Sequence, residues 1–288
     1  MKQITLILIA VLMSSTRVFA QSDNTEITTV TFNIRYNSTE DGINIWENRK
    51  AWLTHSMRFF KADIIGAQEV TYTQLKDMLE LLPSYAYIGI GRDGGNKGEF
   101  SPIFYNKARL EVLKSDTFWL STTPNEVASK GWDAALPRIV TWALFKDKTS
   151  GQTFYHFNTH FDHRGKNARI ESAKLFSEKI NTIANSKPVF ITGDLNSNPS
   201  SETIKTLLEN EIKDPYLTLE NDNVYGPEYT SNGWHAEGRN SEHRIDYVMY
   251  KGDIEPISLQ ILDAQRGDLY ISDHFPLIFK AKLVLKNK

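Results

Sequence analysis

One short stretch constrains the fold of this chain more than any other: an apolar run that ends in glycine and polar residues. Residues 189–192, Val-Phe-Ile-Thr, predict a buried strand, and the Gly-Asp-Leu-Asn-Ser-Asn-Pro sequence after them predicts the turn that ends it. Asp194 and Asn196 then lie where a strand opens into a loop, which suits a metal, a water or a phosphate. An Asx-rich turn that caps a helix starting near Ser200 explains the same residues equally well.

Residues 1–20 predict a secretory signal peptide and not a part of the fold. Lys2 supplies a positive charge, the apolar run from Ile4 to Met13 is too short to span a bilayer, and a small-residue cleavage site ends at Ala20. We therefore expect an exported protein, periplasmic or extracellular after cleavage following Ala20. An uncleaved N-terminal anchor is the alternative.

The composition excludes several classes of protein. The chain has no cysteine, which excludes disulfides, thiolate zinc sites and cysteine nucleophiles. The formal net charge of -2 gives no electrostatic reason for tight, non-specific binding to nucleic acid, although a local basic patch can coexist with it.

Strand patterns dominate the chain, with a few helices between them. This predicts strand-rich layers flanked by helices in one domain, without internal repeats. Helices are expected at residues 46–61, 73–82, 167–183 and about 202–208, with mostly loop at 214–240. Strands are expected at residues 26–34, 63–69, 85–90, 101–105, 110–120, 139–145, 153–160, 189–192, 244–250, 256–262 and 275–284.

Polar side chains recur where the predicted strands end. In a layered α/β protein such ends converge in one crevice, so we expect a single site there. These side chains are Asn33, Glu69, His160, Asp194, Asn196, Asp246, Asp273 and His274.

Other motifs are weaker. Residues 89–94 match G-x-G-x-x-G, but a loop and a strand follow instead of the helix that a dinucleotide site requires. Neither a G-x-S-x-G elbow nor a Walker-type lysine loop is present. Residues 158–163, Asn-Thr-His-Phe-Asp-His, look like the H-x-H-x-D-H motif of metallo-β-lactamase-fold hydrolases, with Asn158 replacing the first histidine. A zinc site there is therefore an alternative that lacks one ligand.

The polar strand ends belong to short motifs that follow one another in a characteristic order. They are Thr31-Phe32-Asn33-Ile34, Ile65-Gly66-Ala67-Gln68-Glu69-Val70, Asn158-Thr159-His160, Gly193-Asp194-Leu195-Asn196, Arg244-Ile245-Asp246-Tyr247 and Ser272-Asp273-His274-Phe275-Pro276. With them the chain resembles the endonuclease/exonuclease/phosphatase superfamily, which includes pancreatic-type deoxyribonucleases, abasic-site endonucleases, neutral sphingomyelinases and inositol-polyphosphate phosphatases. The resemblance implies that residues 21–288 form one catalytic domain. Its fold would be a four-layer α/β/β/α sandwich of two packed, mainly antiparallel sheets flanked by helices, with the site at one edge of the sheets.

The resemblance also implies a Mg²⁺ site, with Mn²⁺ as a substitute. Glu69 is then the principal ligand, Asn33 orients Glu69 or the metal, and Asp273 supports a second metal position. Mg²⁺ suits this set because it takes few carboxylates and keeps waters that a substrate phosphate can displace.

Catalytic roles follow from the same resemblance. Asp194 positions or deprotonates the attacking water, and Asn196 holds that water or a phosphate oxygen. Asp246 hydrogen-bonds His274, which fixes the tautomer of the imidazole and favours its charged form. His274 then serves as general base or as a donor to the phosphate.

Two further positions match the deoxyribonuclease branch. His160 matches a histidine that pairs there with a glutamate, and Glu99 fits the position of that glutamate. Arg138 fits a phosphate-contacting arginine. A solvated loop charge is the alternative for Glu99 and Arg138.

The substrate is less constrained. His163 and Arg164 offer cations to a second phosphate or an anionic head group, and Trp234 lies in an aromatic-rich loop that suits stacking on a base or sugar. We expect Mg²⁺-dependent hydrolysis of a phosphodiester, in nucleic acid, a phospholipid or a small molecule, by in-line attack of water. The alternatives are a phosphomonoesterase of sugar, inositol or lipid phosphates, a zinc hydrolase, and a non-catalytic binding protein. We expect a monomer without a transmembrane segment in the mature chain.

Overall fold

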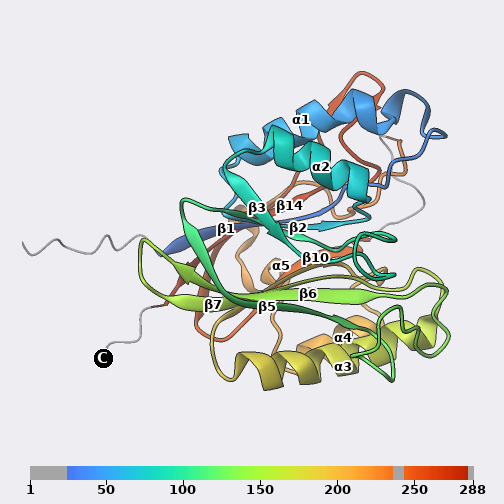
Figure 1. Cartoon of the computed structure of the whole chain (residues 1–288). Coiled ribbons are helices and arrows are strands. Elements are labelled where there is room, and N and C mark those ends of the chain that lie inside the picture. Colours follow the sequence, from blue (N-terminus) through green and yellow to red (C-terminus); the bar gives the residue numbers. More distant parts are fainter. Residues whose placement is uncertain (1–24, 236–242, 285–288) are drawn as a thin grey trace, which may run out of the picture.

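Two β-sheets pack face to face, with helices on both outer faces (Figure 1). The computed structural model describes residues 25–235 and 243–284, so the predicted signal peptide and part of the predicted loop at 214–240 lie outside the described residues. The order of layers is helix, sheet, sheet, helix, which confirms the predicted sandwich. Within the described ranges, none of the helices combines the length and the apolar composition that a membrane crossing requires.

The first sheet has seven strands and holds both ends of the described chain. Most of its neighbours run antiparallel, but β1 and β2 are parallel, as are β11 and β9. Its strand order is β3 (Tyr85–Ile88), β4 (Ile103–Asn106), β2 (Ile64–Gln68), β1 (Glu26–Asn33), β14 (Leu277–Leu283), β11 (Ile254–Ile261) and β9 (Val224–Tyr225).

The second sheet has five strands, and only β7 and β8 pair in parallel. All six residues of β8 are buried, as the apolar run at residues 189–192 predicts. The strand order is β10 (Asp246–Lys251), β8 (Val189–Asp194), β7 (Thr153–His160), β6 (Ile139–Asp147) and β5 (Leu110–Trp119).

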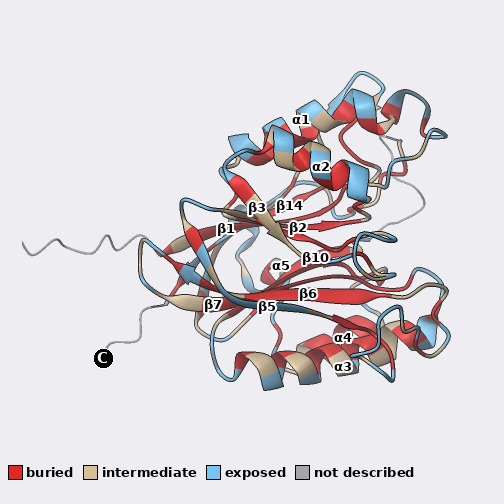
Figure 2. Ribbon diagram, viewed as in Figure 1, coloured by how far each residue is buried: buried red, intermediate tan, exposed pale blue. Residues whose placement is uncertain are grey.

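The outer helices cover the sheets with one face and expose the other (Figure 2). Helices α1 (Trp46–Phe59) and α2 (Tyr72–Leu81) lie on the first sheet, and α3 (Lys166–Ala184) and α4 (Glu202–Glu209) lie on the second (Figure 1). Helix α4 is capped by Ser201, whose Oγ accepts a hydrogen bond from the backbone N–H of Ile204 at 3.3 Å. The helix expected to start near Ser200 thus begins at Glu202, and Asp194 and Asn196 do not cap it.

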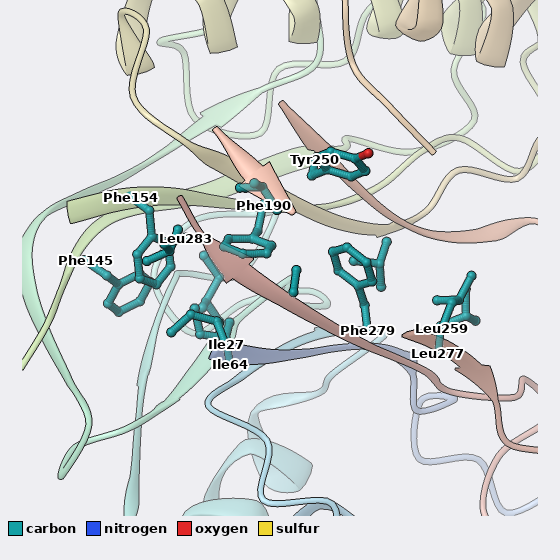
Figure 3. Close-up of a cluster of buried hydrophobic side chains, with 14 of the residues drawn as sticks. Ile27, Ile64, Phe145, Phe154, Phe190, Tyr250, Leu259, Leu277, Phe279 and Leu283 are labelled. Atoms are coloured by element: carbon teal, nitrogen blue, oxygen red, sulfur yellow. The ribbon is translucent and has the colours of Figure 1, made fainter. Parts of the chain in front are cut away.

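The core between the sheets is aromatic at its centre (Figure 3). The ring of Phe190 on β8 lies 5.4 Å from that of Phe154 and 6.2 Å from that of Phe279, which reaches across from β14. Each fully buried phenylalanine stabilises the fold by roughly 1.5–3 kcal/mol relative to an exposed one. These contacts hold the two sheets at a fixed separation.

Toward the polar strand ends the contact between the sheets becomes hydrogen-bonded. Gly66 on β2 allows close approach, because an added Cβ would lie 1.9 Å from Oγ1 of Thr192. Asn158 on β7 donates to the carbonyl oxygens of Ala67 and Pro102 at 2.7 and 2.9 Å, and it accepts from Gln68 at 2.7 Å. The side chain of Asn158 therefore links the two sheets by hydrogen bonds.

Several small elements fall in segments that the sequence pattern left as loop. They are too short to show a regular spacing of apolar residues, and neighbouring elements hold them in place. They are α5 (Pro215–Thr218), β9, the hairpin of β12 (Gln265–Arg266) and β13 (Leu269–Tyr270), and two 3₁₀ turns, η1 (Gly42–Asn44) and η2 (Asn221–Asn223).

Candidate active site

Strand register places three of the predicted site residues in one row across the second sheet. His160 pairs with Asp194 in the parallel β7–β8 ladder, and Asp246 pairs with Asp194 in the antiparallel β10–β8 ladder. Directly paired residues present their side chains on the same face, about 4.5–5.5 Å apart. The carboxylate of Asp194 therefore lies between an imidazole and a second carboxylate.

The first sheet contributes Asn33 and Glu69 to the same place. Nδ2 of Asn33, at the end of β1, donates to Oε1 of Glu69 at 3.0 Å and to Oδ2 of Asp194 at 2.9 Å. Glu69 follows β2 with a φ of +61°, a left-handed conformation that turns the chain out of the sheet. The backbone N–H of Tyr36 donates to its other carboxylate oxygen at 3.2 Å. The predicted orienting contact between Asn33 and Glu69 is present.

A cavity of about 530 Å³ opens at this edge of the paired sheets. Behind it, Asn33 and Asp246 are buried and bonded to residues that line it. The predicted site residues that line the cavity are Glu69, Glu99, Arg138, His160, His163, Asp194, Asn196, Asp273 and His274.

His274 and Asp246 form the predicted pair. Nδ1 of His274 donates to Oδ2 of Asp246 at 2.8 Å, and Oγ1 of Thr230 donates to the same oxygen at 2.6 Å. Burial alone would lower the pKa of His274, but the charges of Asp246 and Asp194 raise this pKa well above its ordinary value. A raised pKa favours the imidazolium, so of the two predicted roles of His274 it favours donation to a phosphate oxygen.

The environment of Asp194 makes it a proton acceptor near neutral pH. Burial, and after it the charge of Asp246, raises the pKa of Asp194 to about 7. Its Oδ1 accepts a hydrogen bond from the backbone N–H of Asn196 at 2.9 Å. A carboxyl group with this pKa suits the deprotonation of water.

His160 is held in its neutral form. Burial, together with the charge of Arg138, lowers its pKa well below the ordinary value. Nε2 of His160 accepts a hydrogen bond from Nδ2 of Asn196 at 3.0 Å and lies 3.6 Å from Oδ2 of Asp194. Asn196 has a φ of +47°, and this turn brings its carboxamide back over the end of β7.

Within the described residues, two groups of side chains have ligand atoms close enough to share a metal ion. Glu69, His160 and Asp194 form one group, and Asp194, Asp246 and His274 form the other, with ligand atoms within 4.8 Å of one another in each. The first group fits a divalent cation better, because Nδ1 of His274 in the second already donates to Oδ2 of Asp246. Asp273 lines the cavity but belongs to neither group, so its predicted support of a second metal has no cluster behind it.

The predicted pairing of Glu99 with His160 is wrong. Oε2 of Glu99 accepts a hydrogen bond from Nη1 of Arg92 at 2.8 Å, and the partner of His160 is Asn196. Arg92 lies on the same glycine-rich turn as Glu99 and reaches it first. Glu99 still lines the cavity, with its side chain 22% exposed.

The residues of the zinc-like motif form hydrogen bonds within the loops around the cavity. Asp162 accepts hydrogen bonds from the backbone N–H groups of Ala135, Arg164 and Gly165. These bonds outweigh burial and lower the pKa of Asp162 to about 2. Arg138 lies 3.5 Å from Asp162 and donates to Nδ1 of His163 at 2.9 Å. Neither Asp162 nor His163 belongs to a group that could bind a metal within the described ranges, so the zinc alternative loses its basis.

Two predicted substrate-binding residues do not line the cavity. Arg164 is exposed, and among the described residues its only hydrogen bond is the one that its backbone N–H donates to Asp162. Trp234 packs against the core between the sheets and lies 5.6 Å from the guanidinium of Arg49. At this position the aromatic loop therefore packs on the core and does not offer Trp234 to a substrate.

Other residues that line the cavity were not assigned from the sequence. Arg35 and Tyr36 lie two and three residues after Asn33, and the rule that polar residues at strand ends form the site could have found them. Arg92 and Leu136 lie in loops, and the pattern of apolar residues does not predict the path of a loop. The remaining two are Ser231 and Ile245.

Solved structures similar to this chain share its fold over nearly its whole length. An endonuclease/exonuclease/phosphatase from Bacteroides vulgatus is 39% identical, with a TM-score of 0.85 and coverage of 90% of this chain and 100% of that chain. A mannosyl-6-phosphatase from Bacteroides thetaiotaomicron VPI-5482 is 36% identical, with a TM-score of 0.83 and the same coverage.

The sequence itself has relatives and matches a family model. An uncharacterized protein of Acanthamoeba polyphaga mimivirus is 32% identical over 162 residues, which are 53% of this chain and 59% of that protein. Residues 30–274 match the endonuclease/exonuclease/phosphatase family, a range that contains every strand-end residue of the cavity. The chain therefore belongs to the endonuclease/exonuclease/phosphatase family of phosphoesterases.

Proposed function

We propose that this protein is a Mg²⁺-dependent phosphomonoesterase that acts on a phosphorylated sugar or a similar small polyol. One observation carries the proposal: Glu69, Asp194 and His274 meet in one cavity of about 530 Å³. That volume lies in the range of sites that bind small molecules.

The chain's own residues supply complementary roles around a phosphate. Glu69, with His160 and Asp194 nearby, would hold the cation, and Asn33 fixes the orientation of Glu69. A bound Mg²⁺ supplies neutralisation of the charge on the phosphoryl oxygens. Asp194 takes a proton from the attacking water, and Asn196 orients that water. His274, protonated and held by Asp246, donates a hydrogen bond to a phosphoryl oxygen.

The preference for a sugar monoester rests on two further points. The mannosyl-6-phosphatase is 36% identical and is covered over its full length. The cavity lining also mixes acidic and basic side chains, among them Glu99, Arg92 and Arg138, and the protein has a net charge of -2. A groove for a nucleic-acid backbone is usually basic throughout.

The phosphodiester expected from the sequence remains a second candidate, because one observation favours it. Arg138 and His163 are hydrogen-bonded to each other and line the cavity beside His160. These groups could bind the oxygen of the ester that stays uncleaved.

The test compares monoesters with diesters on protein freed of metal by EDTA and dialysis. Mannose 6-phosphate, glucose 6-phosphate, p-nitrophenyl phosphate, bis-p-nitrophenyl phosphate and single-stranded DNA are assayed with added Mg²⁺, Mn²⁺ or Zn²⁺. We expect phosphate release from the sugar phosphates with Mg²⁺ or Mn²⁺. Turnover of the diesters alone would favour the second candidate, and activity with Zn²⁺ alone would overturn the assignment of the metal.

A further inference from the structure

The glycine-rich turn between β3 and β4 brings two charged residues face to face at the cavity. The backbone N–H of Arg92 donates to the carbonyl of Glu99 at 2.9 Å, and that of Asp93 donates to the carbonyl of Lys97 at 3.2 Å. The chain thus closes on itself like a small hairpin. Arg92 and Glu99 stand opposite each other at its base.

Glycines make this closure possible. At Gly91 an added Cβ would lie 2.0 Å from the carbonyl oxygen of Lys97. Gly98 has a φ of +71°, and a Cβ there would lie 2.4 Å from Oδ2 of Asp93. The G-x-G-x-x-G pattern therefore serves a narrow turn and not a dinucleotide.

The side chains of this turn form an ion pair with spare hydrogen-bonding capacity. Nη1 of Arg92 lies 2.8 Å from Oε2 of Glu99, with the two side chains 13% and 22% exposed. Within residues 25–235 and 243–284, Nη1 is the only side-chain nitrogen of Arg92 that donates a hydrogen bond, and Oε2 is the only side-chain oxygen of Glu99 that accepts one. Both residues line the same cavity as Glu69 and His160.

The chemistry of this pair fits hydroxyl groups better than a second phosphate. Glu99 neutralises Arg92, and its own charge would repel an anion. A hydroxyl group can donate to a carboxylate and accept from a guanidinium at once, and hydrogen bonds to charged groups are stronger than neutral ones. Two neighbouring hydroxyls on a ring would therefore be bound by both members of the pair.

We propose that the Arg92–Glu99 pair is a specificity site that binds neighbouring hydroxyl groups of the sugar that leaves the phosphate. This inference rests on the proposed function, since it names the part of the site that selects the leaving group. It assigns Glu99 to the substrate's ring and not to proton transfer with His160. The reaction itself is unchanged: water replaces the sugar oxygen on phosphorus, and the sugar leaves with a proton.

The test is Glu99→Gln, assayed on a sugar phosphate and on p-nitrophenyl phosphate, which has no neighbouring hydroxyls. The substituted amide still accepts a hydrogen bond but carries no charge, so kcat/KM for the sugar phosphate should fall about tenfold. For p-nitrophenyl phosphate the change should stay within about threefold. Glu171→Gln is the matched control, because Glu171 forms an ion pair of the same 2.8 Å length with Lys174 on the surface of α3.

Two outcomes would overturn the specificity site. An equal loss on both esters with a shifted pH profile would make Glu99 part of proton transfer. Unchanged kinetics on both esters would make the pair irrelevant to the substrate. If Glu99→Gln fails to fold by thermal melting, Arg92→Lys, which keeps the charge but loses the planar fork, is put through the same comparison.

Failure of the proposed function is distinguishable from failure of the pair. A wild-type protein that hydrolyses neither monoester overturns the proposed function. In that case saturation-transfer NMR with the free sugar still tests the pair. Binding by wild type that is lost in Glu99→Gln supports it, and equal or absent binding contradicts it.

Discussion

Nδ2 of Asn33 lies 2.9 Å from Oδ2 of Asp194, although the two residues belong to different sheets. The same amide also donates to Glu69 at 3.0 Å. Through one side chain, the carboxylate of the first sheet is therefore held at a fixed distance from that of the second. The site is set by how the sheets pack and not by a single loop.

Asn33→Ala should weaken both metal binding and stability. Removal of the amide leaves two carboxylates without their shared donor, so more Mg²⁺ should be needed for half-maximal activity. The free energy of unfolding should fall by about 1–3 kcal/mol. Mg²⁺ titrations of activity and urea denaturation measure the two effects. Asn37→Ala is the control, because Asn37 is exposed four residues away, and an equal effect there would contradict the bridging role.

His274→Ala and Asp194→Ala should each abolish most phosphoesterase activity. The first removes the donor to the phosphate and the second the acceptor for the proton of water, steps that contribute about 10²–10⁴-fold each. Steady-state kinetics at saturating Mg²⁺ check the loss, with circular dichroism to show that each variant folds. His55→Ala on the exposed face of α1 is the control. A folded variant that keeps most of the turnover would remove that residue from the mechanism.

The affinity for Mg²⁺ should depend on pH through Asp194. Without metal the pKa of this carboxyl is about 7, raised by burial and by Asp246. A proton therefore competes with the cation below pH 7, and the apparent affinity should fall about tenfold between pH 8 and pH 6. Calorimetric titration of the metal-free protein at the two values measures this. A flat profile, or one that persists in Asp194→Asn, would contradict it.

His156 should make the fold sensitive to acid. It is fully buried on β7, 3.2 Å from Oγ1 of Thr192, and burial lowers its pKa from 6.5 to about 3. Between these values the unfolded chain carries a proton that the folded protein lacks. The free energy of unfolding therefore rises with pH in this window. The contribution of His156 to it is lost progressively as the pH falls below 6.5.

Replacement of His156 tests this dependence. Acidification from pH 6.5 to 4.5 should remove about 2–3 kcal/mol through this residue, and His156→Gln should lose that part of the slope. Urea denaturation across the range measures it. The surface variant His55→Gln should keep the wild-type slope, and an unchanged slope in His156→Gln would contradict the assignment.

The sequence predicts the strand ends well because they combine two strong signals. An apolar alternating run identifies the strand, and the polar residue after it is placed by the end of that run, as at Asn33, His160 and Asp194. The β-strand of residues 153–160 and its final His160 agree with the structure residue for residue. The register of the ladders then places the ends of neighbouring strands side by side, which brings these residues together.

The errors fall where residues compete for one partner. Glu99 could reach His160 or Arg92, and only the path of the glycine-rich turn decides between them. Trp234 could face the substrate or the core, and its aromatic character suits both. Asp162 and Asn158 carry metal-binding atoms that the loops and sheets use as hydrogen-bonding ties. Such choices depend on distances, which spacing along the chain does not contain.

The row of His160, Asp194 and Asp246 limits how a chain of this kind can diverge. Each member faces the same side of the sheet because of its register, and insertion of one residue into β8 would turn Asp194 to the opposite face. A change in the length of these strands would therefore break the row. The turn that holds Arg92 and Glu99 lies outside the ladders and is free of this constraint of register. The residues that carry out the reaction and those that select the substrate thus lie on separate segments. These segments can diverge at different rates.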